Sequence, residues 1–447
     1  MSINLRRLTK TSDKDFFEVV RHSMWAFIVL GVAGFVQIAL DLVLARSFGA
    51  QGVGIFSLAF TIIFMLSLVG RLGFNRAVIR FIPRFKIDKD WEGLKGLLHS
   101  AESITFRLSI LLTFTTYISA PYLATHIFHQ PELTSYIKLF SLSLTPMALL
   151  YVRTGFLSGL KAVKESVFLE RASQNIITLL FIFIAGNRIG LGSAVIGMVA
   201  GTFISAVMCS FVLKRIMPPT NKHRAFDKKL LIIVAAPLLF VDFSNQMTGQ
   251  INVLILGTQL PASAVGVFSA TLRLSALISL ILNAVNAIAT TKFSELYTKK
   301  ELQKLELVAS KSSALSLLAG LPFILILYFA PSQVLGLFGA SFRETGIDSL
   351  RILVLAHTFN LATGSTVQML AMTGNQKELA YGTVSTILIL NIILSIIFVP
   401  LFGINGAALA VALSLTAKNV VLYALVKKRL GISTLPFAAA KHILNNL

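Results

Sequence analysis

Short motifs in the first half of the chain return in the second half at a nearly constant distance. Three of the matched pairs are Gly54-Ile55-Phe56-Ser57 with Gly266-Val267-Phe268-Ser269, Gly190-Leu191-Gly192 with Gly403-Ile404-Asn405, and Val212-Leu213-Lys214-Arg215 with Leu425-Val426-Lys427-Lys428. The offset is 266 − 54 = 212 for the first pair and 403 − 190 = 213 for the second. Chance similarity between apolar helices is the alternative, but Gly, Lys and Arg match as well as Leu and Val. The repeat predicts two duplicated bundles with a pseudo-twofold axis, as in many membrane transporters.

The composition places these bundles in a membrane. Of the 447 residues, 55% are hydrophobic and 13% are charged, and the mean hydropathy is +0.80. Soluble chains carry about 25% charged residues, and no soluble core could bury this much apolar surface. The single cysteine, Cys209, lies in an apolar run and has no partner for an internal disulfide, so we interpret it as a small packing residue.

Apolar runs of about 20 residues, the length that crosses a bilayer, occur twelve times along the chain. They lie near residues 23–46, 53–75, 101–125, 135–158, 167–187, 190–213, 230–257, 264–290, 309–330, 346–371, 380–400 and 404–426. The sequence therefore predicts an all-α polytopic membrane protein of twelve transmembrane helices in two six-helix lobes. The predicted lobes are residues 1–218 and 219–447, each with a polar tail.

Basic residues fall on alternate loops between the predicted spans. The chain has 40 Lys and Arg against 19 Asp and Glu, a net charge of +21. The loops on the other side carry only Arg46, Arg188 and Arg343. The positive-inside rule then predicts a multi-pass protein of the cytoplasmic membrane with both termini in the cytoplasm. Because membrane topology accounts for the charge, we do not predict nucleic acid as a partner.

Motifs of enzymes and metal sites are absent from the sequence. No Gly-rich phosphate-binding loop ends in Lys-Ser or Lys-Thr, which argues against ATP-driven transport by this chain alone. His126 and His129 lie on one short loop with no third ligand nearby, so they are better interpreted as loop histidines than as a zinc site. We predict no catalytic residues, no metal and no cofactor.

Charged residues inside the predicted spans are the best candidates for a function. A charge at the bilayer centre costs roughly 2.5–3.5 kcal/mol on insertion scales, so it usually faces a partner or a watery cavity. Bases outnumber acids there, and a surplus of buried positive charge suits an anionic substrate such as a phosphate or diphosphate. The predicted cationic cavity consists of Arg273, Arg351, Lys418, Arg153, Lys138 and Arg46. Several of these side chains could instead reach the lipid headgroups, and Arg273 is the hardest to explain in that way.

Acidic and amide side chains form a second set of candidates. Asp41 and Asp242 are the only acids that we place well inside the predicted spans. Asp41 could couple transport to H⁺ or Na⁺, because a carboxylate in low dielectric can cycle through protonation, or it could be a structural partner of an interior arginine. The polar residues predicted to line a cavity or a lobe interface are Asn245, Gln246, Gln250, Asn252, Asn283 and Asn286.

Two segments of the chain carry recognisable motifs. One runs from Arg46 through Gly49 and Gly54 to Phe56, and the more specific one is Val399-Pro400-Leu401-Phe402-Gly403-Ile404-Asn405-Gly406-Ala407-Ala408. These motifs resemble those of the polysaccharide (O-antigen-type) flippases of the multidrug/oligosaccharidyl-lipid/polysaccharide exporter superfamily. The first resembles that family's turn between the first two helices, and the second resembles the P-x-[YF]-G-[IV]-x-G-A-A signature that enters helix twelve.

This resemblance implies a V-shaped transporter that moves an undecaprenyl-diphosphate-linked oligosaccharide from the inner to the outer leaflet by alternating access. It also implies a role in cell-surface polysaccharide biosynthesis, of which O-antigen and lipopolysaccharide are examples. The implied partners are the lipid-linked substrate, membrane lipids, a polysaccharide polymerase and chain-length proteins. A cation-coupled multidrug antiporter of the same superfamily is the alternative, with Asp41 as its acid. A scaffolding membrane protein without transport is the third, and the pseudo-symmetric polar interior argues against it.

Overall fold

The computed structural model describes residues 3–218, 224–375, 379 and 389–436. Every regular element in these ranges is a helix. This follows from the composition, because a segment in hydrocarbon must satisfy its backbone hydrogen bonds internally. Large apolar side chains also cover the outside of the bundle: Phe183, Ile184 and Phe329 are 75%, 80% and 73% exposed. Such a surface is suited to lipid and not to water, so the chain is a multi-pass membrane protein.

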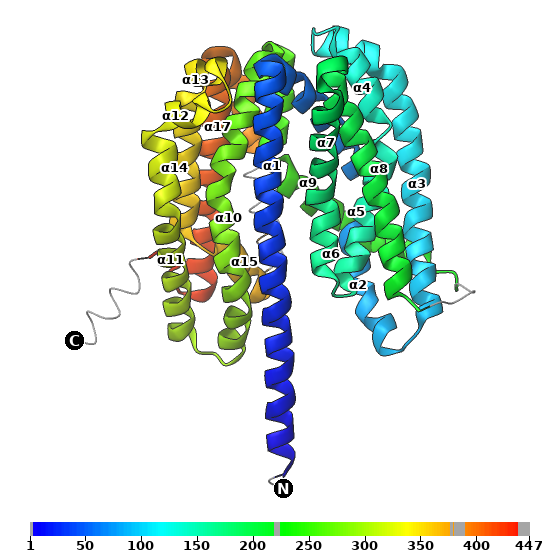
Figure 1. The fold of residues 1–447 in the computed structure, drawn as a ribbon. Coiled ribbons are helices and arrows are strands. Elements are labelled where there is room, and N and C mark those ends of the chain that lie inside the picture. The colour runs from blue at the N-terminus through cyan, green and yellow to red at the C-terminus, as the bar shows by residue number, and fades with distance from the viewer. Residues whose placement is uncertain (1–2, 219–223, 376–378, 380–388, 437–447) are drawn as a thin grey trace, which may run out of the picture.

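The first lobe contains the helices before residue 218. They are α1 (Ile3–Arg71), α2 (Phe74–Ile87), α3 (Trp91–Tyr122) with its π-helical end η1 (Leu123–Ile127), α4 (Leu133–Ser141), α5 (Leu144–Gly159), α6 (Val163–Val167), η2 (Phe168–Ala172), α7 (Ser173–Ile189) and α8 (Leu191–Ile216). In Figure 1 the helices α3, α4, α5, α7 and α8 form one side of the molecule.

The second lobe contains the helices after the linker. They are α9 (Lys228–Gln259), α10 (Ala262–Thr298), α11 (Leu302–Phe329), α12 (Pro331–Gly336), α13 (Ala340–Thr345), α14 (Ile347–Thr363), α15 (Thr366–Met372) and α17 (Leu390–Leu430). Figure 1 shows α10, α11, α14 and α17 on the other side, with α9 between the two groups. The twelve-helix, two-lobed fold predicted from the sequence is confirmed. The exact boundary at 218/219 stays a prediction, and residues 219–223 lie outside the described ranges.

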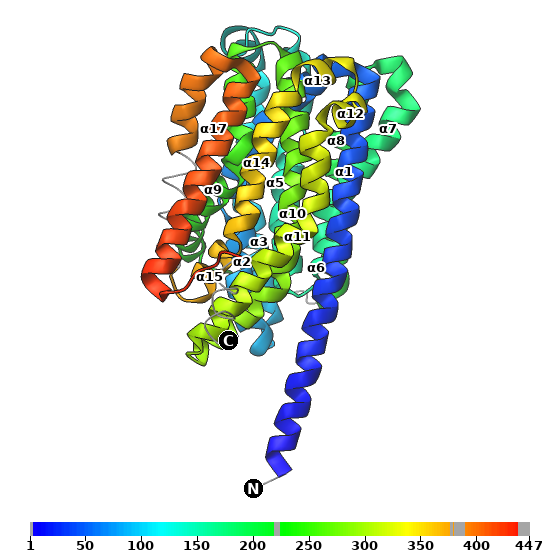
Figure 2. The same ribbon diagram turned by 90° about the vertical axis from the view of Figure 1, so that its left-hand side faces the viewer.

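The two ends of the bundle differ, and we name them by their loops. The end that carries the N-terminus and the loop between α2 and α3 is the basic end; the end that carries α12 and α13 is the distal end (Figure 1). Figure 2 shows that α1 extends beyond the other helices at the basic end.

Backbone geometry confirms the internal repeat. Gly190 separates α7 from α8 with φ 59° and ψ −139°, and Gly403, its partner in the repeat, bends α17 with φ 58° and ψ −131°. Only glycine adopts this region readily. The same two-span turn is therefore built twice, at the distal end of each lobe.

The kink at Gly49 in α1 falls between the first two predicted spans, and the kink at Gly403 in α17 falls between the last two. The helices depart from the predicted spans at two places. The fourth span is broken into α4 and α5, which meet at 46°, and the tenth is broken at Gly364, which has φ 70°. Seven described helices are long and apolar enough to cross a membrane, or eight if the bent pair is one span. The breaks in the fourth and tenth spans lie inside apolar runs, so the sequence has no charged residues that would mark them.

The apolar core is shared by the lobes toward the distal end and divided toward the basic end. One cluster joins Leu40 and Val53 of α1 to Val265 and Phe268 of α10. Toward the basic end, one cluster around Phe74 joins the first lobe to the beginning of α9, and another around Phe293 lies within the second lobe. The beginning of α9, with Leu231 and Ala235, packs in the first of these. The basic half of α9 therefore packs with the helices that precede it.

Candidate functional site

The distal contact between the lobes is made by backbone against backbone. A Cβ atom on Gly54 would overlap the carbonyl oxygen of Ala262, and a Cβ atom on Gly266 would overlap the carbonyl oxygen of Ala50. Both pairs keep the offset of the repeat, since 266 − 54 = 212 and 262 − 50 = 212. The repeated Gly-[Ile/Val]-Phe-Ser motif thus forms a pseudo-symmetric contact, and glycine is required because the two helices approach so closely.

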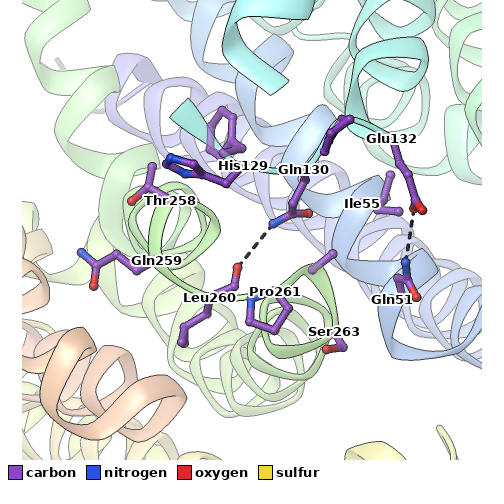
Figure 3. Close-up of a pocket in the computed structure, with 13 residues that line it drawn as sticks. Gln51, Ile55, His129, Gln130, Glu132, Thr258, Gln259, Leu260, Pro261 and Ser263 are labelled. Atoms are coloured by element: carbon purple, nitrogen blue, oxygen red, sulfur yellow. Dashed lines mark hydrogen bonds between the residues drawn. The ribbon is translucent and has the colours of Figure 1, made fainter. Parts of the chain in front are cut away.

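A cavity of about 570 Å³ lies above this contact at the distal end (Figure 3). Amide side chains bridge its walls: Gln130 donates a hydrogen bond to the carbonyl oxygen of Leu260 at 3.3 Å, and Gln51 donates one to Glu132 at 3.2 Å. Beside the lobe contact, Arg46 donates to the carbonyl oxygens of Leu337 at 2.5 Å and Gly336 at 3.3 Å. The exposed side chain of Arg46 thus joins the two lobes at this end.

Asp41 and Arg273 form an ion pair between α1 and α10, in the interior of the molecule. Asp41 is 6% exposed at its side chain and Arg273 is 28% exposed. Gln37, one helical turn before Asp41, donates to the carboxylate at 3.2 and 3.3 Å, and Asn175 of α7 donates to the Gln37 oxygen at 2.8 Å. The hardest interior arginine to explain from the sequence therefore has a carboxylate partner in the opposite lobe.

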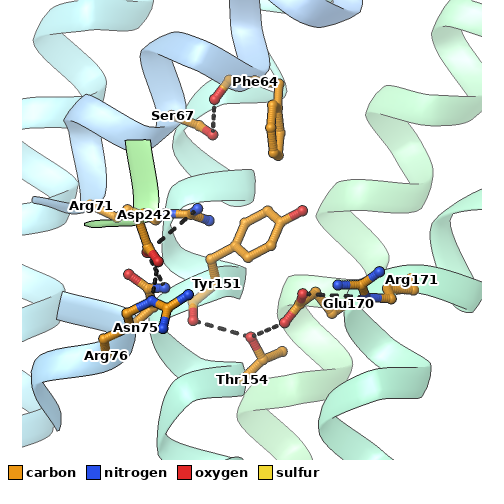
Figure 4. Close-up of polar contacts among 10 residues, drawn as sticks. All are labelled: Phe64, Ser67, Arg71, Asn75, Arg76, Tyr151, Thr154, Glu170, Arg171 and Asp242. Atoms are coloured by element: carbon orange, nitrogen blue, oxygen red, sulfur yellow. Dashed lines mark hydrogen bonds and ion pairs between the residues drawn. The ribbon is translucent and has the colours of Figure 1, made fainter. Parts of the chain in front are cut away.

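Asp242 of α9 binds three side chains at the junction of α1 and α2 (Figure 4). Asn75 donates to its carboxylate at 2.7 Å, Arg76 forms an ion pair with it, and Nη2 of Arg71 lies 4.0 Å from Oδ2. Arg71 is 1% exposed and its guanidinium lies 4.1 Å from the centre of the Tyr151 ring. This polar cluster joins helices of the two lobes toward the basic end, as the glycine contact does at the distal end.

The other predicted cations do not meet at one place. Arg153 pairs with Glu102 at 2.5 Å and donates to the carbonyl oxygen of Ala206 at 2.9 Å. Lys138 lies over the Tyr117 ring at 5.4 Å.

Arg351 is exposed at the start of α14. It lies 3.9 Å from Asp348 and donates to the carbonyl oxygen of Tyr328 at 3.2 Å. No contact joins it to Arg273 among the described residues. The structure therefore does not gather the six predicted cations around one chamber, and their role in binding substrate stays a prediction.

Lys418 lies next to a polar network inside the second lobe. Ser279 of α10 and the Nδ1 atom of His357 on α14 are 2.8 Å apart. Asn360 donates to Ser279 at 3.4 Å, and Asn419 of α17 donates to Asn360 at 3.0 Å. No carboxylate in the described part of the chain forms an ion pair with Lys418, which distinguishes it from Arg273.

The amide residues of the predicted polar face are mostly used in packing between helices. Gln250 accepts a hydrogen bond from Thr61 at 3.0 Å. Asn252 is buried between α9 and α17, where it donates to Asn391 at 3.1 Å and accepts from Ser395 at 2.5 Å.

The remaining members of this set are placed differently. Asn286 accepts from Ser365 at 2.5 Å, Gln246 is partly buried and Asn283 is exposed. The side chain of Asn245 lies outside what the structure describes.

Two further acids are paired near the starts of predicted spans, because Glu102 binds Arg153 and Glu170 accepts from Thr154 at 3.2 Å. Of the partners that sequence reasoning missed, Gln37 had a usable signal, since it precedes Asp41 by one turn. Asn75 and Arg76 had none.

Comparison with known proteins agrees with this architecture. The profile of a family described as polysaccharide biosynthesis protein matches residues 19–291, and the MatE profile matches residues 237–413. A protein of Haloferax volcanii, described as a probable low-salt glycan biosynthesis flippase, is 34% identical over 180 residues. That match covers 39% of this chain and 36% of the relative's length.

Two solved structures share the fold. An inward-facing multidrug resistance MATE transporter has a TM-score of 0.74 at 17% identity and covers 91% of this chain and 98% of its own. The lipid II flippase MurJ, in an inward closed conformation, has a TM-score of 0.74 at 16% identity and covers 95% of this chain and 91% of its own.

Proposed function

We propose, from the premise that the chain belongs to the family of polysaccharide biosynthesis proteins, that it is a flippase for a lipid-linked oligosaccharide. The substrate is an oligosaccharide carried on undecaprenyl diphosphate, moved from the inner to the outer leaflet of the cytoplasmic membrane for cell-surface polysaccharide. The basic end faces the cytoplasm in this proposal, as the loop charges favour. The partial match to the glycan flippase of Haloferax volcanii supports the substrate class.

The observation that carries the proposal is the unequal joining of the lobes. They share one apolar cluster toward the distal end, whereas toward the basic end α9 packs with the first lobe while α10, α11 and α17 form a separate cluster. Alternating access needs such an arrangement, because one contact must open while the other closes. A transporter closed at its distal end can receive a headgroup from the basic side.

Interior cations supply the chemistry that a diphosphate headgroup requires. Lys418 has no carboxylate partner among the described residues, and Arg273 keeps a 28% exposed side chain beside Asp41. Arg273 is the better ligand for a phosphate oxygen, since a guanidinium binds two oxygens at once. In this proposal Asp41 holds Arg273 in place until the substrate arrives.

The test is transport of a fluorescent undecaprenyl-diphosphate-linked oligosaccharide by the purified protein in proteoliposomes. We expect the wild type to flip the lipid and Arg273→Ala to reduce the rate by at least tenfold, while inserting normally. Arg188→Ala is the matched control, because Arg188 is exposed at the distal end. Absence of flipping by the wild type would refute the proposed function, and flipping by Arg273→Ala at the wild-type rate would remove Arg273 from the site.

Export of a small molecule coupled to H⁺ or Na⁺ is the second candidate function. The buried Asp41, with its Gln37 and Asn175 network, favours it, because a carboxylate in low dielectric is a suitable ion site. The same proteoliposomes decide between the two: an imposed pH or sodium gradient should drive export in the wild type and not in Asp41→Asn. Flipping that ignores both gradients would eliminate Asp41 as a coupling residue.

A further inference from the structure

Three side chains at the junction of α1 and α2 converge on one carboxylate. Asn75, Arg76 and Arg71 surround Asp242 of α9, and the first two bind both of its oxygens (Figure 4). The site is built by a short turn: Gly73, with φ 76°, separates α1 from α2 and lies against the backbone of α9. The carboxylate comes from another helix, α9, and not from the turn itself.

Arg71 has hydrogen-bonding capacity that Asp242 does not use. A guanidinium has five N–H donors, yet neither Nε nor Nη1 of Arg71 has an acceptor among the described residues. The side chain is 1% exposed, and its closest approach to Asp242 is 4.0 Å. Buried donors without acceptors are costly, so a group with more oxygens than a carboxylate would satisfy this site better.

The charges near the site also leave a surplus of positive charge. Arg71 and Arg76 together face the single carboxylate of Asp242. The nearby Glu170 already has partners, since it lies 3.8 Å from Arg171 and accepts from Thr154. If Asp242 withdrew, two guanidinium groups and one amide would face an open site. That donor set suits a phosphate or diphosphate, which brings more negative charge and more acceptor oxygens.

We propose that Arg71, Asn75 and Arg76 form an anion-binding site for the diphosphate of the carrier lipid, and that Asp242 occupies it when substrate is absent. The inference rests on the proposed function for the identity of the lipid. Asp242 then acts as an internal competitor: the substrate displaces it and frees α9 from the junction of α1 and α2. Its place at the basic half of the molecule fits a first contact with the headgroup rather than the interior site at Arg273.

The experiment measures binding of inorganic diphosphate to the full-length protein in nanodiscs. Asp242→Asn keeps the shape of the side chain and removes its charge, so we expect about tenfold tighter binding, equivalent to about 1.4 kcal/mol. Adding Arg71→Gln should reverse that gain. Arg80→Gln is the matched control, because Arg80 is an exposed base on α2. Unchanged affinity in Asp242→Asn, or tight binding without Arg71, would overturn the proposal.

A measurement on the otherwise native chain covers the case in which these variants do not fold. With Cys209→Ala as background, spin labels at positions 84 and 302, both exposed at the basic end, report the distance between α2 and α11. Diphosphate should lengthen this distance, and an unchanged distance would overturn the proposal.

A further arm separates the lipid from the free ion. Nanodiscs that contain undecaprenyl diphosphate should reproduce the effect of the inorganic ion. A response to the ion alone would overturn the assignment to the carrier lipid. If diphosphate binding behaves as expected while proteoliposomes flip no oligosaccharide, the proposed function fails and the anion site remains.

Discussion

Two of the contacts between the lobes differ in their chemistry: one is made by backbone atoms and the other by charged side chains. At the distal end, Gly54 and Gly266 bring backbone against backbone, and the contact obeys the pseudo-twofold symmetry of the repeat. At the basic end, Asp242 of α9 contacts Arg71, Asn75 and Arg76. A close apolar contact has no charged group that an ionic ligand could displace. A charged contact can be displaced by a ligand that carries the same charge as the carboxylate. Under our proposal we therefore expect the basic end, and not the distal end, to respond to an anionic substrate.

The largest effect is expected from filling the glycine contact. Gly54→Leu and Gly266→Leu should each destabilise the distal-closed state by about 2–3 kcal/mol, the upper range for overpacking. Cysteines at positions 51 and 263, which line the same distal cavity, would then crosslink less efficiently. Gly31→Leu is the control, since nothing lies within 4 Å of a Cβ there. Because the contact is pseudo-symmetric, unequal effects of the two leucines would contradict our account of it.

A smaller effect should follow when the repeated turns are altered away from the lobe contact. Gly190→Ala and Gly403→Ala each place a side chain at a φ near 60°, which costs of order 1–3 kcal/mol. Thermal unfolding in detergent should show equal losses of stability for the two variants, because both glycines have the same backbone geometry. Gly186→Ala, within α7, controls for the added methyl group. A loss of stability at only one of the two positions would show that the two turns do not contribute equally to the stability of the fold.

The smallest effect is expected at Arg46, whose exposed side chain joins the lobes beside the glycine contact. Arg46→Ala removes two hydrogen bonds to the carbonyl oxygens of Gly336 and Leu337. Because the side chain is exposed, we expect its loss to destabilise the distal-closed state by less than about 1 kcal/mol. The crosslink between positions 51 and 263 should barely change. A loss as large as that of Gly54→Leu would mean that polar contacts, and not the backbone, close the distal end.

Much of the fold could be predicted from the sequence because its signals are local. Hydropathy located the spans, and the matched glycines at 190 and 403 located equivalent turns. The breaks at residues 142–143 and at Gly364 were missed, since they lie inside apolar runs. For the site, the sequence identified Asp41, Arg273 and Asp242 as unusual, but it gave no means of joining Asp41 to a residue 232 positions away.

By itself, the sequence determined that the chain crosses a membrane as two duplicated halves, since the length and spacing of apolar runs are properties of each segment alone. Only the tertiary structure decided which charges are paired, and at which end of the bundle glycines allow helices of the two lobes to come into backbone contact. The reason is physical. In a medium of low dielectric a charge pairs with whichever opposite charge the packing brings within a few ångströms, and packing between lobes depends on helices that are far apart in the chain.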